Sequence, residues 1–262
     1  MPEQRRHRTP FPTATSIAAP GPTRAAMPRL ALSRPTDRFV LLLGALVLAD
    51  LVFLAIHVAQ ETVPGVDDIM FNLSEDRSHA EFFNYIKYVW LGAAMLGCTW
   101  LTRSLRYLPW AVLFGYFLLD DAFGVHEKMG TALTDGLGLP DVLGLRGQDL
   151  GELLFFALAG LVVVGGLVLA WRGAPAHWRA VSREFAILIV ALGVVGVGFD
   201  LVHAMADGLG LTGSAAVFGT LEDFGEMVVV SLMAWRGFEA LEDLRRPVNG
   251  VASLPARALV DA

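Results

Sequence analysis

Long runs of apolar residues alternate with short polar stretches along most of the chain. Such a run crosses about 30 Å of hydrocarbon when it is helical and about 20 residues long, because an α-helix rises about 1.5 Å per residue. The pattern predicts an all-α, polytopic membrane protein with a six-helix transmembrane domain over residues 38–243. We expect the membrane spans near residues 38–58, 82–103, 107–126, 150–171, 184–206 and 219–238.

The segments on either side of this domain differ from it in composition. Residues 1–37 are rich in Arg, Pro, Ala and Thr and have no helical periodicity, which is typical of a disordered tail. Residues 244–262 are interpreted as a second loose tail. The first apolar run has no small-residue cleavage site just beyond it, so we expect it to stay in the membrane as a signal anchor.

Composition narrows the class of protein. Of 262 residues, 55% are hydrophobic and only 18% are charged, which excludes an ordinary water-soluble domain. The single cysteine, Cys98, excludes an intrachain disulfide and a cysteine-based metal cage. No Walker motif, nucleophile elbow or HExxH sequence is present. We therefore expect membrane lipid as the surroundings, with a lipid as a candidate substrate, and no nucleic acid as a partner.

The arginines predict the orientation of the chain. They are concentrated in the N-terminal tail, in residues 103–106, in residues 172–183 and in residues 236–246, which all fall on one side of a six-span arrangement. By the positive-inside rule that side is cytoplasmic, whereas the opposite loops carry mostly Asp and Glu. We expect a protein of the inner membrane with both termini in the cytoplasm.

Two of the predicted hairpins resemble each other in sequence. One contains LLDDAFGVH followed by DLGELLFFALAG, and the other contains VGFDLVHAM followed by DFGEMVVVSLMA. In each, Asp and a Val-His pair lie on the outgoing helix and Asp-x-Gly-Glu opens the returning helix. The first hairpin, with LADLVFLAIH and SHAEFFNYIKYV, is a fainter third copy. The pattern predicts two or three parallel repeated hairpins, with equivalent residues at equal depth.

This repeat gathers acids and histidines in the outer half of the membrane. Counted from the nearest arginine, His57, His126 and His203 all lie roughly 28 to 30 Å from the cytoplasmic side. Ionised side chains at membrane depth are costly unless they are paired, and Lys87 and Lys128 are the only lysines nearby. Protons, water or a metal ion must therefore neutralise the layer.

A divalent metal, namely zinc, iron or manganese, is the leading candidate for this role, because carboxylates and neutral imidazoles suit such ions. A metal here could serve a hydrolase or an oxidoreductase that acts on a lipid. Asp50 and His57 are optional members of the site. The predicted metal ligands are Asp121, His126, Glu152, Asp200, His203 and Glu226, with Glu222 and Asp223 as supporting acid or base groups.

Sequence spacing determines whether two of the predicted ligand pairs can lie on one helix face. Asp200 and His203 are three residues apart and share a helix face. Asp121 and His126 are five residues apart, so they converge only if Gly124 distorts the helix.

Two other interpretations stay open. Intramembrane Asp, Glu and His can form the relay of an ion- or proton-coupled transporter, although matching acids are missing from the cytoplasmic halves of spans three to six. Alternatively, the protein is a structural scaffold in which acids cap the returning helices, and we expect this role for Asp149 and Asp223.

Glycines 193, 196 and 198 are expected to allow close helix packing.

Overall fold

A computed structural model describes residues 37–65 and 68–246, and this part of the chain is all-helical, with no β-strand. The predicted tails at 1–37 and 244–262 lie outside the described residues, except that Asp37 begins the first helix and residues 244–246 end the last one.

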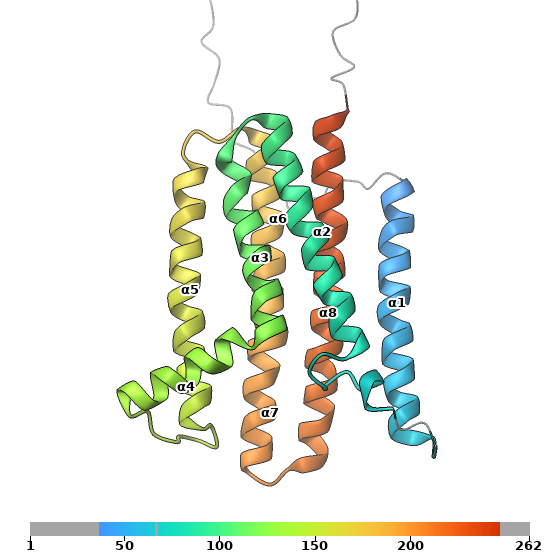
Figure 1. Cartoon of the computed structure of the whole chain (residues 1–262), viewed down its shortest axis with the longest axis vertical. Helices are drawn as coiled ribbons and strands as arrows, with labels where there is room; N and C mark the ends of the chain where they lie inside the picture. The colour runs from blue at the N-terminus through green and yellow to red at the C-terminus, as the bar shows by residue number, and fades with distance from the viewer. Residues whose placement is uncertain (1–36, 66–67, 247–262) are drawn as a thin grey trace, which may run out of the picture. The chain divides into compact units, whose positions relative to one another are not determined.

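The predicted spans correspond to long helices that run in alternating directions (Figure 1). A short helix, α4, interrupts the alternation after α3, and a π-helical segment, η3, joins α6 to α7. The elements are α1 (Asp37–Thr62), η1 (Ile69–Phe71), α2 (His79–Thr102), η2 (Leu105–Tyr107), α3 (Leu108–Phe123), α4 (Val125–Leu137), α5 (Gly147–Trp171), α6 (Ala176–Gly193), η3 (Val194–Gly198), α7 (Phe199–Gly208) and α8 (Thr212–Arg245).

Three helical stretches are long and apolar enough to cross a membrane, as expected of an integral membrane protein: Arg38–Thr62, Gly147–Trp171 and Ala176–Gly208. Leu105–Phe123 together with Val125–Leu137 makes a fourth if this bent pair is one span. The helices α2 and α8 do not meet the same standard of length and apolar composition. Six membrane crossings therefore stay a prediction.

The two less apolar helices make extensive contacts with other helices of the bundle. The helices α2 and α8 pack along each other; α8 also packs against α1, α6 and α7, and α2 packs against α3. Aromatic and methionine side chains fill the core between them, including Trp110, Phe114, Trp178, Phe185 and Met233. Because neighbouring helices cover one face of α2 and much of α8, those faces can carry polar residues that a lipid-facing surface excludes.

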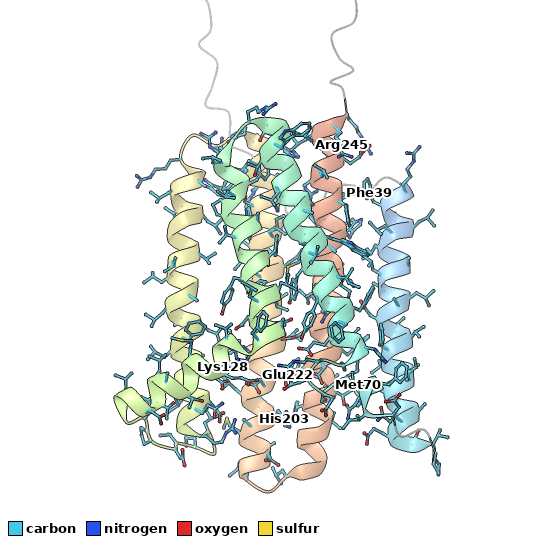
Figure 2. All side chains as sticks on the ribbon, in the orientation of Figure 1. Phe39, Met70, Lys128, His203, Glu222 and Arg245 are labelled. Atoms are coloured by element: carbon cyan, nitrogen blue, oxygen red, sulfur yellow. The ribbon has the colours of Figure 1, made fainter. Side chains whose placement is uncertain are left out.

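The arginine-rich turns lie at one end of the helices. The turns between α2 and α3 and between α5 and α6 are at the same end as the described termini (Figure 1). Figure 2 shows Phe39 and Arg245 at this end and Lys128 and His203 at the other. This arrangement agrees with the prediction that the arginine clusters share one side.

Two helices end or begin at other residues than the predicted spans. The span predicted to end at residue 126 ends at Phe123, because Gly124 adopts a left-handed conformation (φ +57°) and closes the helix. The chain then turns by 76° into α4, which occupies much of the predicted outer loop. The last span, predicted from residue 219, begins at Thr212 and extends to Arg245.

Candidate functional site

Most of the predicted site residues share one cavity of about 1520 Å³, which α2, α3, α4, α5, α6, α7 and α8 line. Seven of the eight predicted residues line it; only His203 does not. The lining also includes Glu81 and Asp120, which the sequence analysis did not single out. The predicted residues that line the cavity are Asp121, His126, Glu152, Asp200, Glu222, Asp223 and Glu226.

The bend at Gly124 determines which aspartate meets His126. The Asp120 carboxylate accepts the backbone N–H of His126 at 2.8 Å, and its other oxygen lies 3.1 Å from His126 Nδ1. The helix is indeed distorted at Gly124, the condition for Asp121 and His126 to converge, but the turn brings Asp120 rather than Asp121 to His126 at the start of α4. The His126 ring also stacks on Phe156, with centroids 5.2 Å apart.

Asp121 instead faces the cavity near α8. Glu226 lies within electrostatic reach of Asp121, Glu222, Asp223 and Asp200. Carboxylates from α3, α7 and α8 therefore line the same cavity.

The π-helical segment gives Glu226 its position. A Cβ atom added to Gly196 would overlap Oε1 of Glu226, so this carboxylate lies directly against the glycine. Gly225, one residue earlier on α8, faces Val195 in the same way. The predicted close packing is confirmed at Gly196, whereas an added Cβ at Gly193 would meet nothing within 4 Å. Single π-helical turns are frequent at functional sites.

Glu222 and Asp223 have different neighbours. His203 Nδ1 lies 3.9 Å from Oε2 of Glu222, and Ser74 donates its hydroxyl to Oδ2 of Asp223 at 2.5 Å. His203 is thus paired with Glu222, and no hydrogen bond joins it to the predicted partner Asp200 among the described contacts. The predicted capping role of Asp223 is wrong, because α8 begins well before it.

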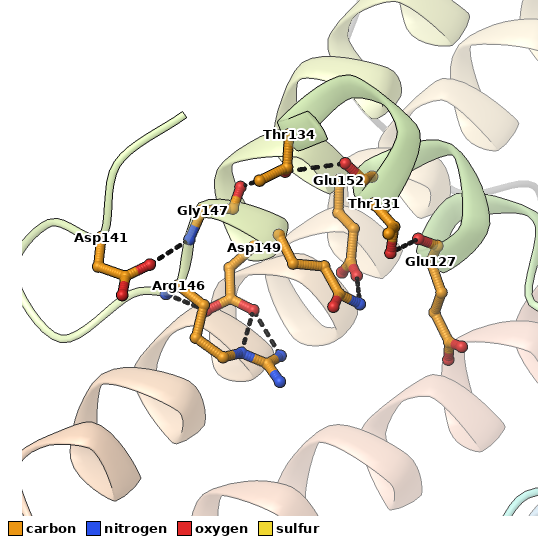
Figure 3. A network of polar contacts seen from close by, with 10 residues as sticks. Glu127, Thr131, Thr134, Asp141, Arg146, Gly147, Asp149 and Glu152 are labelled. Atoms are coloured by element: carbon orange, nitrogen blue, oxygen red, sulfur yellow. Dashed lines mark hydrogen bonds and ion pairs between the residues drawn. The ribbon is translucent and has the colours of Figure 1, made fainter. Parts of the chain in front are cut away.

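Asp149 does cap its helix, as predicted. Its carboxylate accepts the backbone N–H of Arg146 at 2.7 Å and the Arg146 guanidinium at 3.0 and 2.6 Å (Figure 3). The hydrogen bond to Asp149 raises the pKa of Arg146. Glu152, one turn further on, accepts the side-chain amide of Gln148 at 2.9 Å. These bonds fix the outer end of α5.

A close crossing of α4 and α5 positions Glu152 near His126. An added Cβ at Gly151 would overlap the carbonyl oxygen of Gly130, and one at Gly130 would overlap Cγ of Glu152. Thr134 strengthens the crossing by donating to the carbonyl oxygen of Gly147 at 2.7 Å (Figure 3). The small residues therefore hold α4 across the outer end of α5.

Asp50 and His57 of the first hairpin do not line the cavity, although other residues of that hairpin do. Asp50 lies 2.7 Å from Lys87 Nζ and accepts the Ser231 hydroxyl at 2.6 Å, with both charged side chains 0% exposed. His57 accepts the backbone N–H of Leu73 at 3.3 Å. Asp50 and His57, the optional members of the predicted site, therefore have structural partners.

The described part of the chain contains no group of three or more His, Cys, Asp or Glu side chains that could hold a metal ion. Cys98 is buried in the core, among side chains of α2, α3 and α8. The predicted zinc, iron or manganese therefore stays a prediction.

Comparison with known proteins identifies the family. The family model described as Domain of unknown function (DUF8692) matches residues 40–240, and the chain belongs to this family. No curated protein and no solved structure matches the chain.

Proposed function

We propose that the chain is a six-span protein of the inner membrane, with both termini in the cytoplasm, and that its acidic cavity binds a divalent metal and acts on a membrane lipid. The arginine-rich turns support the orientation, since they lie at the same end of the helices as both described termini. The metal is zinc, iron or manganese, for which carboxylate and imidazole ligands are suited.

The observation that carries the proposal is the convergence of Asp121, Asp200 and Glu226 from three helices on one cavity. Several ionised carboxylates between membrane-spanning helices are costly without a cation. The buried lysine cannot serve them, because Lys87 already binds Asp50, Asn84 and the carbonyl oxygen of Met227. A bound divalent cation would offset this cost. Its binding requires side-chain rotation that draws the carboxylates closer together.

We propose hydrolysis of a lipid ester as the reaction. Carboxylates can transfer protons, and a metal, when bound, would polarise the carbonyl group. Asp223, held by Ser74, would accept a proton from the attacking water. Glu222, held near His203, would donate a proton to the leaving alkoxide as the ester C–O bond breaks. The products are a carboxylic acid and an alcohol.

A transporter is the second candidate, and the core argues against it. Met227, Val230 and Met233 continue from Glu226 toward the cytoplasmic end of α8, and they are 2%, 0% and 0% exposed. An ion path needs a continuous series of polar groups or water. The buried apolar residues interrupt such a path below the acidic layer.

A purely structural role explains the presence of Asp149 and Asp50 in the bundle, because each binds a cationic side chain. It does not explain why Asp121, Asp200 and Glu226 line a cavity.

We also propose that the hairpins are parallel repeats. In two of them the glutamate of the Asp-x-Gly-Glu motif lies against a glycine of its own hairpin: Glu152 against Gly130, and Glu226 against Gly196. The second motif lies inside α8 and does not open it, which corrects one part of the predicted correspondence.

The reaction is tested on the full chain, loaded with zinc, iron or manganese in vesicles of phosphatidylcholine and phosphatidylglycerol. We expect mass spectrometry to detect free fatty acid and lysolipid, and Glu222→Gln to slow their release about 100-fold or more, which is the contribution typical of a general acid or base. Glu239→Gln is the control, because Glu239 is also buried on α8 but lies outside the cavity. Equal rates for Glu222→Gln and the wild type would exclude the proposed role, and absence of products with all three metals would exclude ester hydrolysis of these lipids.

A further inference from the structure

The cavity continues beyond the carboxylates as an apolar corridor between α5 and the helices α3 and α6. Its walls change from charged to aliphatic toward the arginine-rich end of the bundle. We define the corridor by Leu108 and Val112 of α3, Val163 and Leu167 of α5, and Ile189 and Val190 of α6.

The corridor exists because α5 packs tightly only at its outer end. Its buried residues are Gly147, Asp149 and Gly151, all near the crossing with α4. Beyond that crossing α5 makes few contacts with α3 and no extended contact with α6 (Figure 1). Gly160 and Gly166 widen the wall of the cavity on α5, since an added Cβ at either would meet nothing within 4 Å.

Hydrocarbon is the medium beside this corridor, because α5 and α6 are both among the helices apolar enough to cross a membrane. If the corridor were empty, the side chains of its walls would lose dispersion contacts. Water is not expected to fill it, because Leu, Val and Ile offer no hydrogen-bond partners. From Asp120 to Leu108 the corridor extends about 18 Å at 1.5 Å per helical residue. This length slightly exceeds the roughly 15 Å of hydrocarbon in one leaflet, and because Leu108 lies at the arginine-rich end, an acyl chain in the corridor extends into that half of the bundle.

The outer mouth of the same cavity carries cations. Arg77, Lys128 and Arg146 all line it, beside the acids Glu75, Asp76 and Glu127, and all three cations belong to the segments at the outer end of the helices. Arg146 binds Asp149 through Nε and one NH2 group, yet its side chain stays 69% exposed, so further guanidinium N–H donors can face a ligand. Arginine and lysine at this position suit a phosphate group.

Along its length the cavity therefore presents a charged mouth with both cations and acids, then the carboxylate layer, then an aliphatic corridor. We propose that it binds one phosphate-bearing diacyl lipid of the outer leaflet, with the phosphate at the cationic mouth and one acyl chain in the corridor. This orientation brings the ester linkages to the level of Glu222 and Asp223. The proposal rests on the proposed function, for which it names the substrate class.

Photocrosslinking tests the occupant directly. The probe is phosphatidylglycerol with a diazirine on one acyl chain, in phosphatidylcholine vesicles that contain the full chain. We expect labelling at Val163 and Leu167, in excess over Leu161 and Leu169, which are 71% and 66% exposed on α5 and do not line the cavity. Equal labelling of both sets would overturn the proposal.

Two adjacent glycines provide a matched pair of variants. Gly166 lines the cavity and Gly165 does not, and an added Cβ meets nothing within 4 Å at either. Gly166→Phe should fill the corridor and reduce labelling of Val163 and Leu167 roughly tenfold, which corresponds to about 1.4 kcal/mol of lost affinity. Gly165→Phe should leave the labelling unchanged. An equal effect of the two variants would contradict specific occupancy.

A second probe, diacylglycerol with the same diazirine, measures how much the phosphate group contributes to binding. The phosphate-bearing probe should label the corridor more strongly, and the double variant Arg77→Gln and Lys128→Gln should remove the difference. If both probes label the wild type equally, recognition of phosphate is wrong.

Because labelling requires neither a metal nor turnover, the two proposals fail separately. Corridor labelling without ester hydrolysis would reject the proposed reaction alone. Hydrolysis that is unaffected by Gly166→Phe, without corridor labelling, would reject the lipid-chain site alone.

Discussion

Replacing Lys87 with methionine is expected to lower the free energy of unfolding by about 3 to 5 kcal/mol, the usual cost of removing one partner from a buried ion pair. Lys87 Nζ lies 2.7 Å from Asp50 Oδ1, and both side chains are 0% exposed. The substitution leaves the Asp50 carboxylate with only the Ser231 hydroxyl as its side-chain partner among the described contacts. Denaturant unfolding of the purified protein in detergent micelles measures the loss.

Two further variants separate this explanation from a simple loss of volume. Lys128→Met removes an exposed lysine and should change the stability by no more than about 0.5 kcal/mol. Adding Asp50→Leu to Lys87→Met removes the unpaired charge, so it should recover much of the loss. If Lys87→Met alone costs less than about 1 kcal/mol, the buried pair does not stabilise the bundle as described.

Gly196→Ala is expected to slow lipid hydrolysis about 100-fold, the effect that a displacement of about 1 Å can have on a reacting group. The new methyl group would occupy the space of the Glu226 Oε1 atom, so the carboxylate must move. Mass spectrometry of the vesicle lipids measures the rate.

Gly198→Ala is the matched control. It belongs to the same π-helical segment, but its Cβ would lie 3.9 Å from the nearest atom, the carbonyl oxygen of Gly193. It should keep the wild-type rate and gain up to about 1 kcal/mol of helix propensity. Equal rates for the two alanine variants would show that the contact between Gly196 and Glu226 has no part in the reaction.

The apolar pattern was sufficient to predict the helices, because runs of about 20 apolar residues have few alternatives in a membrane. It was less informative about helix ends. Gly124 ends α3 through its left-handed conformation, and the hydrophobic run continues past it to Val125. The polar sequence TGS before Val217 gave no sign of a helix, yet α8 begins at Thr212. Such ends depend on local turns and tertiary packing, which hydropathy does not measure.

The acids of the site were identifiable from the sequence, because each is unusual within an apolar helix. Their partners were not. Asp120 and Asp121 are adjacent, and only the turn after Phe123 determines that Asp120 meets His126. Asp50 and Asp200 occupy equivalent places in the proposed repeat, but Lys87 neutralises only the first. Pairing across helices depends on helix rotation, which one sequence does not specify.

The central claim is that the acidic cavity holds a divalent metal, and elemental analysis of the protein purified without chelators tests it most directly. We predict about one zinc, iron or manganese per wild-type chain, since one such ion accommodates a set of carboxylate and imidazole ligands. Asp200→Asn and Glu226→Gln should lose the metal, whereas Glu239→Gln, outside the cavity, should retain it. Wild-type protein that is reproducibly free of metal would contradict the claim.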